Sequence, residues 1–335
     1  MKKVLVSIII PVKKINDYLR KETIPAILSQ TYKNFEIIIL PDNSTKEKFP
    51  RTKIIPSWPK LGPADKRDLG ARKAKGEILA FLDDDSYPSE SWLENAIKIF
   101  NAKSLFPSSI AAVCGPTITP PKISFREKIA GYVWGSSLGS RGAGFYRYVV
   151  APRREVDDFP TANLLVRKID FWKVDGFDTH FWSGEDTKLC FRLTKELGKT
   201  IVYDPNVLVY HHRREIFCPH LIQIARYGLH RGHFARIMPQ TSLRVGYFLP
   251  SIFTVGLVGG LILGIFSHIL FLFYLLAIFV YLGGLLLTGI RIFSKEKSPK
   301  TVFIVILAIF LTHLVYGVFF IKGFLTSRLK SKYGR

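Results

Sequence analysis

Residues 78–85 read ILAFLDDD, five apolar residues that lead directly into Asp83, Asp84 and Asp85. A short, unbroken apolar run with polar neighbours is typical of a strand buried on both faces. Three adjacent carboxylates repel one another unless a cation neutralises them. This stretch therefore predicts a central strand whose end carries either a cation site or a solvated acidic turn.

Two similar runs precede this strand, at residues 4–11 and at residues 35–40 (FEIIIL), and Asp42 closely follows the second. Residues 64–75 lie between them and the aspartates and have the character of a helix. Strands that alternate with helices predict an α/β fold with a mostly parallel sheet. Ligands of such sheets bind beyond the carboxyl ends of the strands, so Asp42 and the three aspartates should share one edge.

The rest of the first 245 residues extends this pattern. Further strands are expected at residues 53–55, 111–115, 161–166 and 200–203, and further helices at 18–30, 91–100 and 185–197. Residues 122–158 are rich in Gly, Arg and aromatics and show no clear period, so we expect a surface loop that touches the membrane or solvent.

The C-terminal part of the chain is apolar. Residues 246–290 contain no Asp, Glu, Lys or Arg, and neither do residues 301–321. As a helix, the first run would be about 67 Å long at about 1.5 Å per residue, twice the roughly 30 Å of a bilayer core. We therefore expect spans at about 246–266, 269–290 and 301–321, which excludes a purely soluble or disordered chain.

These features divide the 335 residues into three parts. Residues 1–215 should form an α/β domain, residues 216–245 an amphipathic segment in the membrane interface, and residues 246–335 the transmembrane region. Three spans would put the basic tail, 322–335, on the side opposite the basic linker, 291–300, against the positive-inside rule. Either the tail is tolerated there, or one segment is re-entrant or interfacial.

The charge balance limits the partners. The chain has 48 Lys and Arg against 26 Asp and Glu, a net charge of +22. Such a protein favours a phosphate-bearing substrate, an anionic bilayer face or nucleic acid. The positive charge is spread along the chain and lies partly beside the spans, which disfavours nucleic acid. The N-terminal run is a poor signal peptide, so we expect a multi-pass plasma-membrane protein with a cytoplasmic front domain.

Two further motifs carry chemistry. GED, at residues 184–186, offers either a general base or the ordinary acidic start of a helix. HHRR, at residues 211–214, offers ligands for a metal or a diphosphate, or a basic membrane-surface segment. The oxygen ligands of the aspartates suit Mn2+ or Mg2+, which often bridge substrate phosphates.

The order of these motifs is specific. SIIIPVK, FEIIILPDNS, GPADKRDLGARKAKGEILAFLDDDSYPSESWL, TANLLVRKIDFWKVDGFD and GEDTKLCFRLTKELGKTIVYDPNVLVYHHRR follow one another along the chain. Over about residues 4–245 the sequence resembles the family-2 glycosyltransferases, which share the GT-A fold. LGSRGAGFYR is similar to a loop of membrane-anchored exopolysaccharide enzymes, the succinoglycan glucosyltransferases. The similarity to cellulose and hyaluronan synthases is more distant.

The resemblance implies a nucleotide-sugar site. Residues assigned to the nucleotide are Pro11, Val12, Lys13, Asp42, Arg67, Asp83 and Asp84. Arg67 matches the family's A-x-x-R-N-x-G motif, in which Asp68 replaces the usual Asn. The D-x-D motif, Asp83 and Asp85, would hold Mn2+ or Mg2+, with His211 or His212 as a further contact.

The resemblance also implies an acceptor side. Asp186 matches the catalytic base, with Glu185 beside it, and Asn163 of TANLL falls on the acceptor side. The Q-x-x-R-W motif of processive synthases corresponds to Gln223, Arg226 and Tyr227. In that match, Arg226 would hold the diphosphate, while Gln223 and Tyr227 would contact the acceptor. The alternative for this stretch is an interfacial helix with a snorkelling arginine.

The resulting hypothesis is an inverting, metal-dependent glycosyltransferase. It would move a sugar from a nucleotide-sugar, a UDP-sugar by expectation, to a lipid-linked or polysaccharide acceptor at the cytoplasmic membrane face. One alternative is a polyprenyl-phosphate glycosyltransferase. Another, from a different class, is an inactive membrane scaffold with a transferase-like domain.

Overall fold

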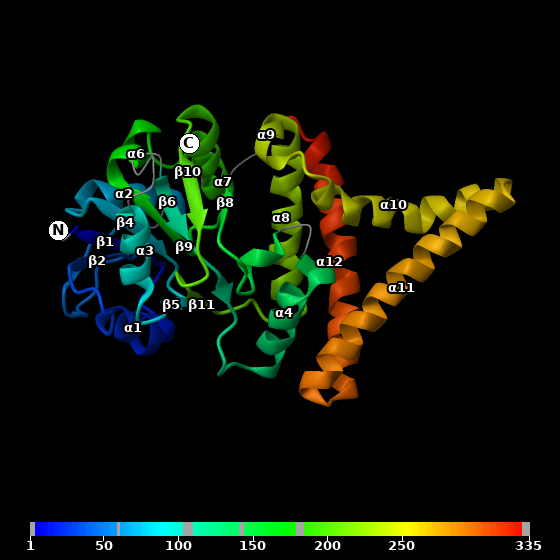
Figure 1. Cartoon of the computed structure of the whole chain (residues 1–335), viewed down its shortest axis with the longest axis horizontal. Helices are drawn as coiled ribbons and strands as arrows, with labels where there is room; N and C mark the ends of the chain where they lie inside the picture. Colours follow the sequence, from blue (N-terminus) through cyan, green and yellow to red (C-terminus); the bar gives the residue numbers. More distant parts are fainter. Residues whose placement is uncertain (1–3, 59–60, 103–109, 141–143, 179–183, 330–335) are drawn as a thin grey trace. The chain divides into compact units, whose positions relative to one another are not determined.

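The computed structural model describes residues 4–58, 61–102, 110–140, 144–178 and 184–329 (Figure 1). Within this part, the chain forms two compact units. The first contains residues 4–120 and 149–212, and the second contains residues 121–148 and 213–329. The chain therefore leaves the first unit after residue 120, returns at residue 149 and leaves again after residue 212.

The first unit is built on an eight-stranded sheet in the order β3-β2-β1-β4-β9-β6-β10-β8. Its strands are β1 (Val6–Pro11), β2 (Phe35–Leu40), β3 (Thr52–Ile54), β4 (Ile78–Leu82), β6 (Ile110–Cys114), β8 (Arg154–Val156), β9 (Asn163–Arg167) and β10 (Thr200–Tyr203). Strands β3, β2, β1 and β4 are parallel to one another, whereas β9 runs antiparallel to both β4 and β6, and β8 antiparallel to β10. The prediction of an α/β fold with a mostly parallel sheet is confirmed.

Helices cover both faces of this sheet because its central strands are apolar on both sides. The helices are α1 (Ile24–Leu28), α2 (Pro63–Lys73), α3 (Trp92–Phe100), α6 (Lys168–Lys173) and α7 (Glu185–Phe191), with π-helical turns at Leu19–Thr23 and Arg192–Glu196. Ile8 and Ile10 of β1 share a buried cluster with residues of α1 and α3. Ile9 points to the other face, where it meets Gly70 of α2. This alternation follows the two-residue period of a strand.

A second, three-stranded sheet lies next to the end of β4. It has the order β5-β11-β7 and consists of β5 (Ser86–Pro88), β7 (Thr117–Ile118) and β11 (Val209–His211). Because β5 begins immediately after Asp85, this sheet brings the distant segment 209–211 to the three aspartates. The sequence analysis did not predict these short strands.

The second unit is helical. It contains α4 (Phe125–Gly135), α5 (Ser137–Ser140), α8 (Cys218–Ile237), α9 (Pro239–Ser242), α10 (Val245–Phe266), α11 (His268–Glu296) and α12 (Pro299–Leu325), with a 3₁₀ turn at Phe145–Arg147. The helices α10, α11 and α12 are each long and apolar enough to cross a membrane. Their bounds agree with the three spans predicted from the sequence.

The expectation of a surface loop over residues 122–158 is wrong. Residues 125–135 form α4, whose Ile129, Ala130 and Val133 are buried against apolar residues of α11 and α12. Ser124 caps this helix by accepting a hydrogen bond from the backbone N–H of Glu127. The partners of α4 lie some 170 residues further along the chain, so no local period reveals which face is buried.

Candidate functional site

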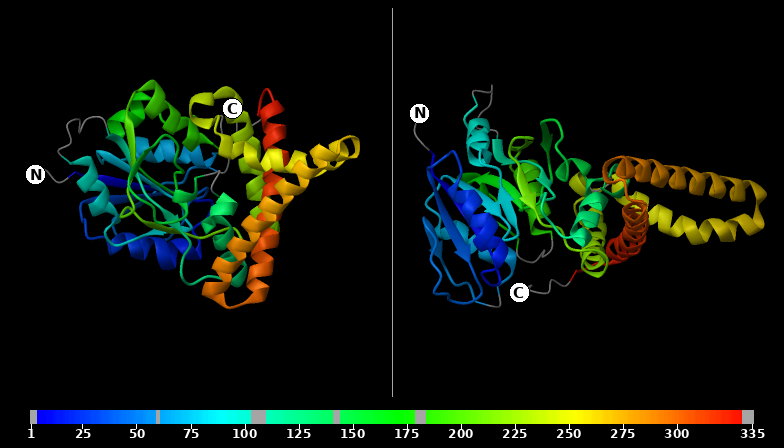
Figure 2. Two further views of the ribbon diagram at one scale, coloured as in Figure 1. Left: turned by 45° about the vertical axis from the view of Figure 1, so that its right-hand side comes forward. Right: turned by 90° about the horizontal axis from the view of Figure 1, so that it is seen from below.

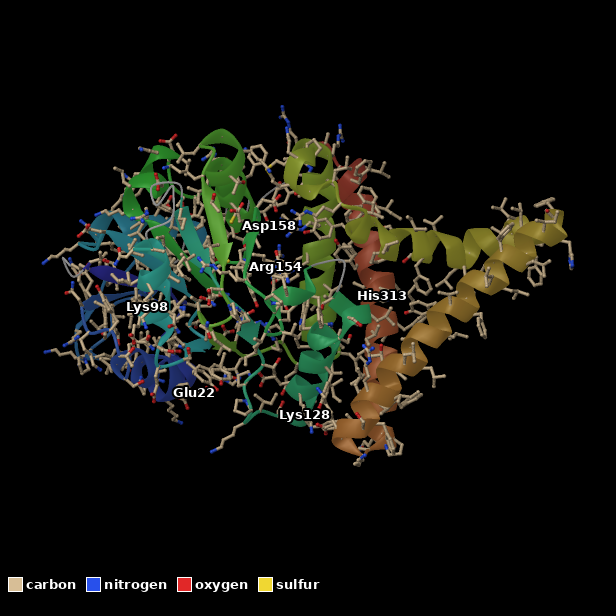
Figure 3. The ribbon with its side chains drawn as sticks, in the orientation of Figure 1. Glu22, Lys98, Lys128, Arg154, Asp158 and His313 are labelled. Atoms are coloured by element: carbon tan, nitrogen blue, oxygen red, sulfur yellow. The ribbon has the colours of Figure 1, made fainter. Side chains whose placement is uncertain are left out.

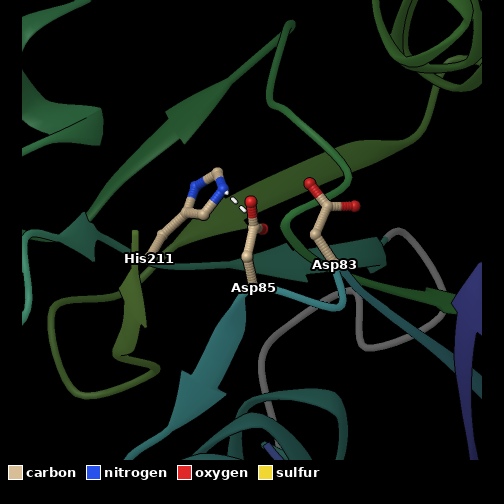
Figure 4. A group of neighbouring side chains, drawn as sticks. All are labelled: Asp83, Asp85 and His211. Atoms are coloured by element: carbon tan, nitrogen blue, oxygen red, sulfur yellow. Dashed lines mark ion pairs between the residues drawn. The ribbon is translucent and has the colours of Figure 1, made fainter. Parts of the chain in front are cut away.

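The three aspartates after β4 have different surroundings. Asp84 accepts a hydrogen bond from Asn16 Nδ2 at 2.5 Å, and burial, together with the charges of Asp85 and Asp83, raises its pKa to about 7. Asp83 and Asp85 instead share a cluster with His211 (Figure 4). Residues 83–86 form a turn, in which the Ser86 N–H donates to the Asp83 carbonyl at 3.2 Å, and this turn separates the middle aspartate from its two neighbours. The assignment of Asp84 to the nucleotide stays a prediction.

His211 reaches the aspartates through the small sheet. Strand β11 pairs with β5 so that His211 lies opposite Ser86. Ser86 directly follows Asp85 in the sequence. Its Nε2 atom is 3.2 Å from Asp85 Oδ1, and one ligand atom from each of Asp83, Asp85 and His211 lies within 4.8 Å of the others. Two carboxylate oxygens and one imidazole nitrogen at this spacing fit a divalent cation such as Mn2+ or Mg2+.

His212, the alternative metal contact, turns to another partner. Its Nε2 lies 2.9 Å from Glu22 Oε2, and its ring is 4.3 Å from that of Tyr18. Glu22, labelled in Figure 3, belongs to the π-helical turn before α1. The backbone N–H of His212 donates to the Asp85 carbonyl at 3.0 Å, but of the two imidazoles only that of His211 lies beside the Asp85 carboxylate.

Arg67 joins the two acidic motifs. Its Nη2 donates to Asp83 Oδ1 at 2.8 Å and its Nη1 donates to Glu185 Oε1 at 3.0 Å. The side chain is buried, and its Nε has no hydrogen-bond partner within the described part of the chain. Burial alone would lower the pKa of Arg67, but the charges of Asp83, Glu185 and Asp186 raise it above its usual value. The guanidinium thus stays charged and ties the DDD turn to the GED turn.

The GED residues begin α7. Gly184 has φ 121°, a backbone conformation that favours glycine. Its N–H donates to Glu185 Oε2 at 3.0 Å, so both oxygens of Glu185 accept hydrogen bonds. Asp186 Oδ1 accepts from the backbone N–H of Thr187 at 2.7 Å. Thr187 Oγ1 also donates to Asp158 Oδ1 at 3.0 Å, which fixes the first turn of α7 to residue 158 (Figure 3).

Asp42 lies in a second charged cluster, where β1 and β2 end. The Lys66 ammonium donates to Asp42 Oδ1 and, at 2.6 Å, to the carbonyl of Val12. Lys13 accepts a hydrogen bond from the Asp42 N–H through its carbonyl at 3.1 Å. The residues 11–13 assigned to the nucleotide base therefore adjoin Asp42, as the strand-end rule predicts.

Sequence reasoning missed Lys66. Consecutive residues on a helix point about 100° apart, so Lys66 and Arg67 cannot serve the same carboxylate. The side chain of Lys66 is 4% exposed, and a lysine is rarely buried without a partner. The sequence did contain a signal for Lys66. It lies next to Arg67 in a helix that faces two acidic strand ends, so each cation could be assigned to one of them.

Asn163, assigned above to the acceptor side, has a structural role instead. It is fully buried at the start of β9. Its Oδ1 accepts from Trp92 Nε1, and its Nδ2 donates to the carbonyls of Gly115 and Val207. These bonds use both ends of the amide to join β9 to α3 and to two loops, so we no longer assign Asn163 to the acceptor.

The other acceptor residues belong to α8, in the second unit. Gln223 Nε2 donates to the Tyr227 hydroxyl at 3.2 Å, and Arg226 is exposed. Their assignment to the acceptor and the diphosphate stays a prediction.

Residues 7–169 match the family described as Glycosyl transferase family 2. The pre-mycofactocin glycosyltransferase of Mycobacterium tuberculosis is 32% identical over 176 residues, which cover 50% of this chain and 33% of that protein. The glucosyl-dolichyl phosphate glucuronosyltransferase of Haloferax volcanii is 22% identical over 209 residues, which cover 57% of this chain and 63% of that protein. The chain thus spans between one third and two thirds of the length of these curated relatives.

Two solved structures share the fold. The mannosyltransferase PcManGT from Pyrobaculum calidifontis, in complex with GDP-Man and Mn2+, has a TM-score of 0.56 at 15% identity, covering 96% of this chain and 88% of that one. GalNAc-T7 with UDP, GalNAc and Mn2+ has a TM-score of 0.50 at 15% identity, covering 73% and 52%. At these identities, the likeness shows the fold and not the substrate.

The sheet topology and the likeness to these solved structures define the fold of the first unit as GT-A-like. Within this fold, residues 7–169 are the part of the chain that matches Glycosyl transferase family 2. The finer similarity to succinoglycan glucosyltransferases and to cellulose or hyaluronan synthases stays a prediction.

Proposed function

We propose that the protein is an inverting, metal-dependent glycosyltransferase that uses a nucleotide-sugar donor and a lipid-linked or polysaccharide acceptor. One observation carries this proposal. Arg67 binds both Asp83 of the DDD turn and Glu185 of the GED turn, although Glu185 lies 118 residues after Arg67 in the sequence. A leaving diphosphate and an attacking acceptor need such neighbouring acidic and basic groups in one fixed arrangement.

The donor would bind at the edge where β1, β2 and β4 end. Asp83, Asp85 and His211 would hold the divalent cation, which supplies positive charge for the diphosphate as it leaves. The Asp42–Lys66 cluster and the carbonyl of Val12 would face the base or ribose. Lys66 also orients the carboxylate of Asp42.

The two GED carboxylates would have different roles. Glu185 accepts from Arg67 and from Gly184, so it orients the arginine. Asp186 would take the proton of the acceptor hydroxyl as that oxygen attacks the anomeric carbon. The new C–O bond forms while the bond to the diphosphate breaks on the opposite face, and the anomeric configuration inverts.

The acceptor is proposed from the second unit. Three helices apolar enough to cross a membrane suit a lipid-linked acceptor, and one relative's name includes dolichyl phosphate. Gln223, Arg226 and Tyr227 of α8 would contact it. We place the catalytic unit on the cytoplasmic face of the plasma membrane because the basic residues flank the apolar segments.

Hydrolysis and transfer by detergent-purified protein test the proposal. UDP-, GDP- and dTDP-sugars would be screened with Mn2+, Mg2+ or EDTA, and Asp85→Ala and Asp186→Asn compared with the unaltered chain. Metal-dependent release of one nucleotide, lost in Asp85→Ala, supports the proposal and identifies the donor. Near-normal turnover of Asp186→Asn would favour a polyprenyl-phosphate acceptor, because a phosphate oxygen needs less base assistance. No turnover and no nucleotide-induced rise in Tm would favour the inactive scaffold.

A further inference from the structure

The helices α10, α11 and α12 are similarly apolar but differently surrounded. Only 6% of the most apolar 18-residue window is buried in α10 and in α11, against 44% in α12. Figure 2 shows α10 and α11 as a hairpin that projects away from α12 and α8 of the same unit. Exposed apolar side chains cover most of both hairpin helices, as lipid requires. The buried residues are Tyr247 and Ser251 at the start of α10 and Leu285, Thr288, Gly289 and Ile292 toward the end of α11.

Helix α12 is enclosed by the other helices of its unit. Its Val305, Ala308 and Ile309 pack with α4, and its Gly317 meets Pro250 and Thr254 of α10. Exposed apolar side chains remain on it at Phe303, Leu307, Val318, Phe324 and Leu325. A partly covered helix with a limited apolar face is suited to the membrane interface.

Helix α8 lies along the second half of α12 at very short range. His220 Nε2 is 3.0 Å from Thr312 Oγ1, and His233 Nδ1 is 3.1 Å from the carbonyl of Thr326. A Cβ atom on Gly232 would stand 2.0 Å from the Phe320 carbonyl, so no other residue fits there without movement. The two helices therefore run side by side in the same direction and must lie at the same membrane depth.

The charges of α8 limit that depth. Arg226 and Arg236 are exposed on α8, and Arg231 lies 4.8 Å from the centre of the Tyr247 ring. If α12 crossed the bilayer, α8 would carry these cations into the hydrocarbon, where a charged side chain near the centre is strongly unfavourable. In the interface, the same cations meet anionic head groups and stabilise binding.

The base of the hairpin is anchored to α4. Glu296, at the end of α11, accepts from Lys128 Nζ at 2.6 Å and from the Tyr132 hydroxyl at 2.6 Å. His313 of α12 lies between Tyr281 of α11, 3.0 Å from Nδ1, and the carbonyl of Leu138, 3.1 Å from Nε2 (Figure 3). These polar contacts occur where α11 approaches α4, α5 and α12, and they fix the end of α11 next to the enclosed helix.

We propose that only the α10–α11 hairpin crosses the bilayer, and that α12 lies in the interface beside α8, sinking its exposed apolar side chains into the lipid. The 22 residues of α10, at about 1.5 Å each, match a bilayer core of roughly 30 Å. This topology puts Arg244, Arg291, Lys322 and Arg328 on one side of the membrane, so the conflict with the positive-inside rule disappears.

Cysteine labelling of the full chain tests the topology, and it does not depend on transfer activity. His268→Cys, Ser294→Cys and Ser327→Cys would each be made with Cys218→Ser, since Cys114 and Cys190 are buried. Cys218 of the unaltered chain reports the side on which α8 begins. A membrane-impermeant maleimide would be applied to right-side-out and inside-out vesicles.

We expect Cys218 and the cysteines at 294 and 327 to react only in inside-out vesicles, and the cysteine at 268 only in right-side-out vesicles. Reaction of the cysteines at 327 and 268 from the same side would show that α12 crosses, and would overturn the proposal. Reaction of all four from one side would overturn it too, because the hairpin would then not cross.

Nitroxide labels give the depth of α12. Single labels at Phe303, Leu307, Val318 and Leu325 would be compared in phosphatidylcholine–phosphatidylglycerol vesicles, with Val258 of α10 as the matched control. An interfacial α12 gives four similar, shallow depths and a deep control. A deep centre with shallow ends would contradict the proposal, and so would shielding from both oxygen and a polar relaxant, which would indicate cover by a second copy of the chain.

Discussion

The two strands that flank β1 in the sheet, β2 and β4, are both followed by carboxylates, and the protein neutralises these carboxylates differently. Asp42, after β2, contacts the buried ammonium of Lys66. After β4, Asp83 shares the guanidinium of Arg67 with Glu185, while Asp85 has His211 beside it. The first carboxylate has its own cation, whereas the second cluster has more negative charge than its one permanent cation balances. The difference explains why a metal ion would be needed at β4 and not at β2.

The partners come from adjacent positions of α2. Lys66, Arg67 and Asp68 are consecutive, and each points to a different part of the unit. Asp68 accepts from the backbone N–H of Phe177 at 3.1 Å. One turn of helix therefore serves both strand ends and also the loop after α6, so changes at these three positions should have separable effects.

Asp85→Ala should have the largest effect, because it would remove one of the three proposed cation ligands, Asp83, Asp85 and His211. A metal contributes several kcal/mol to charge stabilisation, so we expect nucleotide-sugar turnover to fall about 10²- to 10³-fold. Turnover and Mn2+ binding, followed by electron paramagnetic resonance, would both be measured. Lys98→Ala, in an exposed pair with Glu94, is the control; an Asp85→Ala variant that still binds Mn2+ normally would refute the difference between the two strand ends.

Arg67→Met should have the next largest effect, and it should lower stability as well as activity. It leaves Asp83 and Glu185 without their shared cation, and breaking a buried pair costs roughly 3–5 kcal/mol. Thermal unfolding would show a lower Tm than in Arg67→Lys, which keeps the charge. We also expect Mn2+ to raise the Tm of Arg67→Met more than that of the unaltered chain; an equal rise would mean that the arginine and the metal do not share a charge cluster.

The interaction between Asp42 and Lys66 should be independent of the metal. In a double-mutant cycle of Asp42→Asn and Lys66→Met, we expect a coupling of about 1–2 kcal/mol in the free energy of unfolding. Mn2+ should leave this coupling energy unchanged, since the ammonium of Lys66 already balances the charge of the Asp42 carboxylate. A coupling energy that changes with Mn2+ would contradict the idea that a metal is needed after β4 and not after β2.

Asp68→Asn should show the smallest effect, in the pH dependence of stability. Burial raises the pKa of Asp68 to about 7 from an ordinary value of 3.8. The folded state therefore holds a proton that the unfolded state loses, and stability falls as pH rises from about 4 to about 7. Asn can still accept the Phe177 N–H, so the variant should lose less stability over this window. Chemical unfolding at pH 5 and pH 8 would measure how much the free energy of unfolding falls in each protein. An equal fall in Asp68→Asn and in the unaltered chain would mean that Asp68 is ionised throughout.

Elements buried in a single sheet could be predicted from the sequence. The bounds of β2, β4 and β10 agree with their apolar runs because such strands need only local hydrophobicity to be recognised. The placement of Asp42 and Asp83 at one edge followed from the rule for parallel strands. By contrast, β5, β7 and β11 are two or three residues long, and their pairing depends on contacts distant in sequence.

The same limit applies to the site. The residue types left a cation site and an acidic turn open, and the family resemblance assigned a metal to Asp83 and Asp85, but only the register of β11 against β5 decides between His211 and His212. The same resemblance assigned Asn163 of TANLL to the acceptor side. Its burial, with three strong hydrogen bonds, depends on Trp92, Gly115 and Val207, and no pattern within TANLL reveals them.

The chain crosses between its two units at residues 120–121, 148–149 and 212–213, and this has a practical consequence for protein engineering. A truncation after His212, the obvious way to obtain a soluble catalytic unit, would keep α4 but remove the helices that cover its Ile129, Ala130 and Val133. We expect such a fragment to aggregate through that uncovered face. A soluble version would also need residues 121–148 replaced by a short polar linker, so the membrane helices and the transferase domain are interleaved in the gene and cannot be exchanged as consecutive modules.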